Sequence, residues 1–309
     1  MPLSNATQVT MFELTGLTDN KRLVPFLFIL FLMIYMVTLM GNVGMIGLVR
    51  AFSSLHTPMY YFLSYLSLVD LVYSSTITPK MLADLISVRK SISFIGCVLQ
   101  IYFYAALASI EVLLLSSMSY DRYAAICHPL HYVSVMTKDK CSSLVLLSFS
   151  VGLMQSLAQT SCVFSLQYCR SNLIDHFYCE IPPLLKLSCS DTFFCEVLTL
   201  FFVSTLGLFS LITVLISYIL IVSSILQMKS ADGRQKAFST CSSHLMCVSI
   251  FFVTVFFVYL RPDTRVLEKQ DKVASVFYSV VTPMLNPLIY SLRNQDVKRV
   301  IIKAIQGCC

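Results

Sequence analysis

The stretch SMSYDRYAAICHPLHY, residues 117–132, ends a long apolar run with an adjacent acid and base, Asp121 and Arg122. Residues 91–120 carry a single charge, Glu111, and they exceed the roughly 20 helical residues that cross a bilayer. His128-Pro129 then breaks the helix, because proline does not continue it. An unpaired charge in hydrocarbon is costly, so such a pair needs water or a partner. The stretch therefore predicts a helix end at a membrane surface.

The rest of the chain repeats this apolar pattern. Its 309 residues are 57% hydrophobic and only 12% charged, about half the charged fraction of a typical soluble protein. The runs long enough to span a bilayer are residues 23–49, 58–79, 91–120, 141–168, 197–228, 237–260 and 273–292. No strand is required. We expect an all-α, seven-transmembrane helix bundle forming a single domain over residues 1–309.

The two ends of the chain extend beyond the bundle. Residues 1–22 are a polar tail, and residues 293–309 form a second tail with apolar residues at helical spacing from Val297 to Ile305. Lys298, Arg299 and Lys303 occupy the other faces, so this segment predicts a short amphipathic helix lying on a membrane. The terminal Cys308 and Cys309 are either palmitoylated or unmodified thiols.

The orientation does not follow from Lys and Arg, because eleven lie on each side of the predicted membrane. Asn5-Ala6-Thr7 is an N-glycosylation acceptor, which is useful only in a luminal tail. Cysteines crowd one loop on the same side, which indicates an oxidising compartment; they are Cys169, Cys179, Cys189 and Cys195. We expect an extracellular N-terminus, glycosylated at Asn5, and a cytoplasmic C-terminus at the plasma membrane.

Six motifs occur in order on successive predicted helices. They are GN at 41–42, LHTPMYYFLSYLSLVDL at 55–71, SMSYDRYAAICHPLHY at 117–132, SY at 217–218, KAFSTCSSHL at 236–245 and PMLNPLIYSLRN at 283–294. Over nearly its whole length the chain resembles the class II, tetrapod-type olfactory (odorant) receptors, a branch of the rhodopsin-like G-protein-coupled receptors. The resemblance implies a small volatile ligand and a stimulatory olfactory-type G protein that raises cAMP.

The resemblance also implies an activation switch. Arg122 would be held by Asp121 at rest and released when the receptor opens to a G protein; the alternative is a helix-end pair whose arginine reaches toward water. His244 is either a packed histidine or part of the activation region near Tyr218. The other residues implied for the switch are Tyr123, Asn286, Pro287 and Tyr290.

Two acids, Asp70 and Glu111, lie deep within predicted spans. As the resemblance suggests, they could share a cation such as Na⁺. Alternatively one or both are protonated and hydrogen-bonded to neighbours such as Asn42, Ser74 or Asn286, since burial favours the neutral carboxyl. No nucleophile-and-base set accompanies the pair, so no enzyme is expected, and no other cofactor.

For the cysteines, the resemblance implies disulfides Cys97–Cys179 and Cys169–Cys189, and it leaves Cys195 unpaired on the outer side. A zinc site near His176 is the rival interpretation. The loop lacks a double Cys-x-x-Cys pattern, so no metal is expected.

The ligand pocket is expected between the outer halves of the third, fifth, sixth and seventh spans. Its candidate lining is apolar with a few hydroxyls, as lipophilic ligands need, although each residue could equally serve helix packing. The candidates are Tyr104, Ala105, Ala108, Ser109, Val112, Phe202, Val203, Leu206, Phe252, Val255, Phe256, Tyr259, Val276 and Ser279. A secondary transporter is the rival class; it predicts inverted repeats and more midplane charges than this chain carries.

Overall fold

The computed structural model describes residues 9–18, 20–169, 171–228, 230–259 and 268–306. Within these ranges it does not describe the side chains of residues 231–233, 236, 239–240, 254–259, 268–271, 292–293, 295 and 305.

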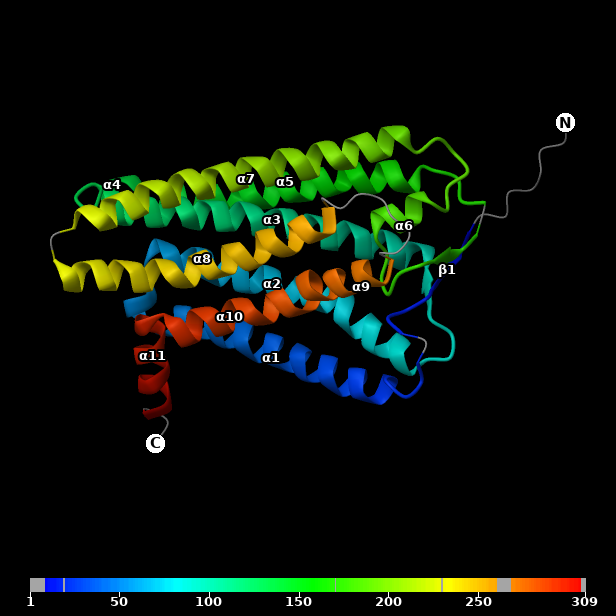
Figure 1. The fold of residues 1–309 in the computed structure, drawn as a ribbon, viewed down its shortest axis with the longest axis horizontal. Coiled ribbons are helices and arrows are strands. Elements are labelled where there is room, and N and C mark those ends of the chain that lie inside the picture. Colours follow the sequence, from blue (N-terminus) through cyan, green and yellow to red (C-terminus); the bar gives the residue numbers. More distant parts are fainter. Residues whose placement is uncertain (1–8, 19, 170, 229, 260–267, 307–309) are drawn as a thin grey trace, which may run out of the picture.

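Long helices run side by side in one bundle (Figure 1). They are α1 Val24–Ala51, α2 Pro58–Ile86, α3 Phe94–Cys127, α5 Lys138–Phe164, α7 Phe193–Gln227 and α8 Ala231–Tyr259. A seventh helical run consists of α9 Glu268–Val276, the π-helical turn η3 Phe277–Val281 and α10 Thr282–Arg293, which follow one another without a break. The predicted seven-helix bundle is confirmed.

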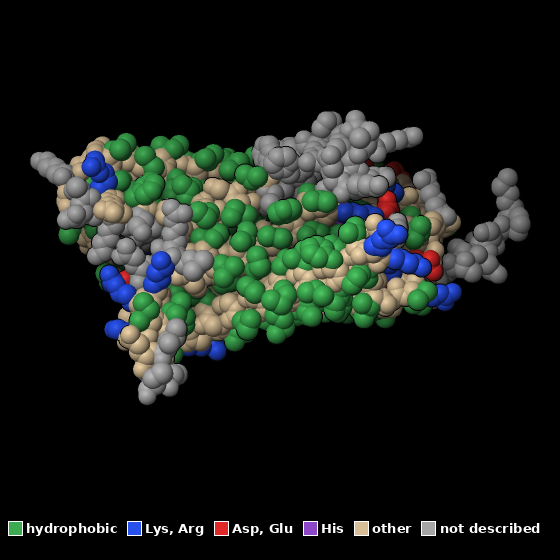
Figure 2. Space-filling view, turned by 60° about the horizontal axis from the view of Figure 1, so that its bottom comes forward, with side chains coloured by type: hydrophobic (Ala, Val, Ile, Leu, Met, Phe, Trp, Pro, Cys, Tyr) green, Lys and Arg blue, Asp and Glu red, His purple; other side chains and the backbone are tan. Residues whose placement is uncertain are grey.

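Apolar side chains cover the outside of the bundle between its ends, and lysines and arginines gather toward the ends (Figure 2). Helices α1, α3, α5 and α7 and residues 272–291 are long and apolar enough to cross a membrane. Helix α2 is equally long, but it turns its polar residues inward, so that Asp70, Ser74 and Thr78 are fully buried. A bilayer as solvent explains this arrangement, because polar groups there must be satisfied inside the protein.

Helix α3 is the centre of the bundle and contacts α2, α5, α7 and α8. It begins at a serine cap, where the Ser93 hydroxyl accepts a hydrogen bond from the Gly96 amide at 3.0 Å. Its contact with α5 depends on Gly152. A Cβ there would lie 2.6 Å from Ile110 Cγ1 and 2.8 Å from the Ala106 carbonyl oxygen, so only glycine lets the two backbones approach this closely.

A small sheet covers the end of the bundle where the N-terminus lies (Figure 1). Strand β1, Met11–Leu14, pairs antiparallel with β2, Ser91–Ser93, and parallel with β3, Leu173–Ile174. Phe12 is fully buried against Phe94 and Tyr168. The sequence held no local sign of this sheet, because the pairing depends on three short segments that only the fold brings together.

Shorter helices complete both ends. At the end with the sheet, α6 (Ile181–Leu185) lies between α5 and α7 along the chain. At the opposite end are η1 (Ser53–Leu55), α4 (Tyr132–Val135) and α11 (Gln295–Gln306), which turns away from the bundle (Figure 1). Val297 and Val300 of α11 are buried and Lys298 is exposed, so the predicted amphipathic helix is confirmed. Cys308 and Cys309 lie outside the described residues.

Candidate ligand cavity, ion-pair switch and outer loop

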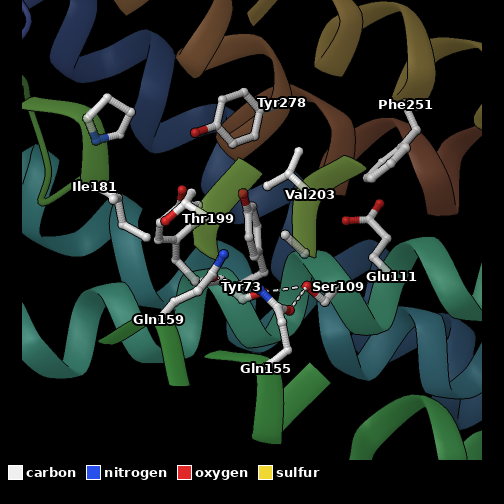
Figure 3. Close-up of a pocket in the computed structure, with 14 residues that line it drawn as sticks. Tyr73, Ser109, Glu111, Gln155, Gln159, Ile181, Thr199, Val203, Phe251 and Tyr278 are labelled. Atoms are coloured by element: carbon white, nitrogen blue, oxygen red, sulfur yellow. Dashed lines mark hydrogen bonds between the residues drawn. The ribbon is translucent and has the colours of Figure 1, made fainter. Parts of the chain in front are cut away.

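A cavity of about 90 Å³ lies inside the half of the bundle nearest the sheet (Figure 3). Its walls come from α2, α3, α5, α6, α7, α8 and η3, and they are mainly apolar or aromatic with a few polar groups. The lining residues are Tyr73, Tyr104, Ala105, Ala108, Ser109, Glu111, Gln155, Gln159, Ile181, Pro182, Thr199, Val203, Phe251 and Tyr278. Such a composition suits a small, largely apolar ligand oriented by few hydrogen bonds.

The structure places five of the expected pocket residues in this lining: Tyr104, Ala105, Ala108, Ser109 and Val203. Six other described candidates do not line it: Val112, Phe202, Leu206, Phe252, Val276 and Ser279. The helical spacing explains this difference, because a shift of one residue turns a side chain by about 100°. Phe251 thus lines the cavity while Phe252 packs against the core. The side chains of Val255, Phe256 and Tyr259 lie outside the described residues.

Sequence reasoning missed the contribution of the fourth span. Gln155 and Gln159 of α5 are spaced by one helical turn in a run without charges, and both are buried. A polar pair on one face of a membrane helix usually points into the protein, so this spacing was an available signal. The lining from α6, Ile181 and Pro182, had no comparable signal, since the position of a loop depends on the tertiary fold.

The polar groups of the cavity form a short chain of hydrogen bonds (Figure 3). The Ser109 hydroxyl donates to Gln155 Oε1, and Gln155 Nε2 donates to Gln159 Oε1 at 2.6 Å. Residues 165–192 form the outer loop, which joins α5 to α7 at the end with the sheet. On the side of this loop, the Tyr278 hydroxyl donates to Glu180 Oε1 at 3.1 Å and is also hydrogen-bonded to Tyr178. These bonds fix the polar side chains around an apolar space.

The two deep acids meet at one amide. Asn286 Nδ2 lies 3.0 Å from Asp70 Oδ2 and 3.4 Å from Glu111 Oε1, and it donates to both. The structure thus brings Asp70 and Glu111 to a common partner. Asn42 instead donates to the carbonyls of Thr38 and Pro283. An arrangement of two carboxyl groups and an amide can hold either a shared proton or a small cation.

At the opposite end of α3, Arg122 Nη2 lies 2.6 Å from Asp121 Oδ2. Tyr132, the first residue of α4, donates to the other oxygen, Asp121 Oδ1, at 2.7 Å. Asp121 is fully buried. The carboxylate therefore has partners on both oxygens and holds the arginine against its own helix. Tyr123 points elsewhere, since its hydroxyl lies 3.0 Å from His128 Nε2.

The other expected switch residues lie between α7, α8 and α10. The Tyr218 hydroxyl is 2.7 Å from His244 Nδ1, and the two rings stack with centroids 5.9 Å apart. Tyr290 is fully buried in α10. Pro287 stands inside α10 and contacts α1 closely, because a Cβ on Gly41 would lie 3.1 Å from Pro287 Cγ.

The outer loop is held by three disulfides. Cys97–Cys179 and Cys169–Cys189 are the pairs that the resemblance implies. The third bond joins Cys162 to Cys195, so the expectation that Cys195 is unpaired was wrong. Cys162 was counted as part of the fourth span; it lies in the last turn of α5, with its Cα 5.7 Å from that of Cys195 at the start of α7. Asn5 lies outside the described residues.

At the end with the sheet, Lys272 of α9 forms a second connection, to Asp175 of the outer loop and to Thr15. Lys272 Nζ lies 2.7 Å from Asp175 Oδ1 and donates to Thr15 Oγ1 at 2.8 Å. The hydrogen bond from Lys272 holds the pKa of Asp175 below its usual value, and the Thr15 hydroxyl, which donates to Asp175 Oδ1 at 2.9 Å, acts in the same direction. Next to it His176 is buried, stacked on Phe177 and in edge contact with Tyr178. Loss of water lowers the pKa of His176 to about 3.

Residues 31–307 match the family model described as olfactory receptor. Human olfactory receptor 5A1 is 49% identical over 98% of this chain and 96% of its own length. The chain belongs to the olfactory receptor family. Mouse olfactory receptor 5AP2 is 54% identical and human olfactory receptor 5B12 is 50% identical, each over 98% of this chain and 96% of its own length.

Family membership, together with the apolar helices, makes the chain a multi-pass membrane protein of the G-protein-coupled receptor class and not an enzyme. The transporter interpretation is thereby excluded. The cavity between α3, α5 and α7 and the ion pair at the far end of α3 are separate candidate sites at different depths of the bundle.

Proposed function

We propose that this olfactory receptor binds a small, mostly apolar volatile ligand in the cavity and activates a stimulatory olfactory-type G protein, which raises cAMP. The observation that supports the ligand class is the lining itself. Ala105, Ala108, Val203 and Phe251 provide apolar contact, and the hydrogen-bonding groups of the lining are few. None of the described lining residues is basic, so among them a carboxylate ligand would find no charged partner.

The ion pair Asp121–Arg122 is the proposed resting latch. Arg122 is held by one oxygen of Asp121 while Tyr132 occupies the other. Ligand binding would shift the outer half of α8, and the opposite end would then open around Arg122, Tyr218 and Tyr290. A freed guanidinium there offers donors to a docking G protein, which a paired one does not.

The experiment is cAMP output in cells that express the receptor and the stimulatory G protein, during a screen of volatile compounds. Arg122→Ala should abolish the ligand response at equal surface level. Arg299→Ala is the matched control, because Arg299 also pairs with an acid at this end of the bundle but is largely exposed. Full signalling by a well-expressed Arg122→Ala receptor, or ligand-dependent flux without cAMP, would contradict the proposal.

The orientation and the ion site are parts of the same proposal. Three disulfides at the N-terminal end favour an oxidising, extracellular side, with Asn5 glycosylated and α11 on the cytoplasmic leaflet. Asp70 and Glu111 would share a Na⁺ ion next to Asn286 in the resting state. Na⁺ should then raise the melting temperature of the wild-type receptor but not of Asp70→Asn; equal shifts in both would exclude the site.

A further inference from the structure

The buried amide of Gln159 has a donor without an acceptor among the described residues. Gln159 is 2% exposed, and its Nε2 has no hydrogen-bond partner. Its amide end is directed toward the centre of the cavity (Figure 3). A buried polar group is ordinarily paired, and leaving one unpaired is unfavourable. The missing partner is therefore expected inside the cavity.

The neighbouring bonds explain why the free group is a donor. Ser109 donates to Gln155 Oε1, and Gln155 Nε2 donates to Gln159 Oε1, which leaves the second amide nitrogen at the end of the chain. Two other hydroxyls of the lining already have protein acceptors. Thr199 donates to the Cys195 carbonyl at 2.8 Å and Tyr278 donates to Glu180.

The size of the cavity limits what can meet this donor. About 90 Å³ is more than a single water needs but less than the roughly 150 Å³ of a cavity that holds benzene. Water can satisfy Gln159 when no ligand is present. A ligand that displaces this water without replacing its hydrogen bond loses affinity, so a purely hydrocarbon ligand is disfavoured.

We propose that Gln159 selects ligands that carry a carbonyl-type hydrogen-bond acceptor on a small apolar skeleton, such as ketones, aldehydes or esters, and that its Nε2 donates to that oxygen. This inference rests on the proposed function, because it takes the cavity as the odorant site. Gln155 and Ser109 are positioning residues here, since they hold the Gln159 amide without touching the ligand oxygen.

The test measures apparent Kd from ligand-dependent thermal stabilisation of the full-length receptor in nanodiscs, which needs no G protein. The probes are matched sets on small skeletons that suit the cavity: acetone, 2-propanol and isobutene, and butanone, 2-butanol and 2-methyl-1-butene. We expect the ketone to bind about tenfold more tightly than the hydrocarbon, the ratio for one satisfied hydrogen bond. Gln159→Met should reduce that ratio to about one.

Two further variants separate donor chemistry from packing. Thr160→Val removes a neighbouring buried hydroxyl that does not line the cavity, and the ketone preference should persist. Gln159→Glu keeps the size of the side chain, removes the amide donor and should shift the preference to the alcohol.

Four results would each overturn the inference. In the wild-type receptor they are equal binding of ketone and hydrocarbon, no stabilisation by any probe, and tightest binding of the alcohol. The fourth is a ketone preference that survives Gln159→Met. A ketone preference without any cAMP response would uphold it and would contradict only the proposed G-protein output.

Discussion

The buried histidine of the outer loop predicts that this loop loses stability in mild acid. His176 is 3% exposed, its Nε2 lies 3.4 Å from Glu180 Oε2, and Lys272 lies near enough to disfavour a second positive charge. The folded pKa is about 3, against an ordinary value of 6.5. Above pH 6.5 the ring is neutral whether the loop is folded or open, so it causes no pH dependence there. Between pH 6.5 and about 3, His176 is protonated in the open loop but not in the folded loop. The free energy of opening the loop therefore falls as the pH falls through this range.

The folded and unfolded pKa values of His176 also give the size of this pH effect. At about pH 5 the open state gains about 2 kcal/mol relative to about pH 7.5, which is roughly a thirtyfold increase in loop opening. Hydrogen exchange of residues 173–181, corrected for the intrinsic pH dependence of exchange, measures it. The Cys179 amide is a suitable reporter, because it donates to Gln100 Oε1 at 2.9 Å in the closed loop.

His176→Gln should remove this pH dependence, because the amide does not titrate in this range. His131→Gln is the control, since His131 is exposed and belongs to the opposite end of the bundle. Protection of the wild-type loop that is unchanged between the two pH values would refute the reasoning, and so would an equal loss of protection in His176→Gln.

Two predictions concern the outer disulfide and the closest helix contact. Cys162→Ser should lower the stability of the receptor by about 3–4 kcal/mol on the chain-entropy model, because a disulfide that closes a loop of 33 residues is lost. Thermal unfolding measures this loss, with Cys127→Ser, which changes a free cysteine, as the control. Alkylation of both Cys162 and Cys195 in folded wild-type receptor would contradict the prediction. Gly152→Val should cost about 1–3 kcal/mol through overpacking, whereas Gly207→Ala meets no atom within 4 Å and should leave the melting temperature nearly unchanged.

The bundle was predictable because a bilayer imposes a simple rule on sequence. Backbone groups in hydrocarbon must be paired within the segment, so an apolar run of sufficient length becomes a helix. The charged stretch at 121–122 marked one helix end for the same reason, and α3 ends at Cys127, before the His128-Pro129 break. The boundaries were less predictable. Helix α2 continues to Ile86, past the expected end at residue 79, because a proline inside a membrane helix does not end it when neighbouring groups compensate.

The outer end was not predictable in the same way. Strand β1 is four residues long, and its partners lie far away in sequence, so no local pattern indicated the sheet. The bond between Cys162 and Cys195 required knowing that the end of α5 lies beside the start of α7. The cavity lining depended on helix rotation, which hydrophobicity alone leaves undetermined in a segment that is apolar all round.

Glu111 connects the two candidate sites through ordinary contacts. Its side chain lines the cavity, and its Oε1 accepts from Asn286, which also donates to Asp70. Asn286 immediately precedes Pro287 in α10, the helix that carries the buried Tyr290. The same side chain therefore borders the ligand space and is hydrogen-bonded to α10 through Asn286. Coupling between the ligand site and the distant switch would require a second arrangement of these bonds, with the ligand favouring one arrangement over the other.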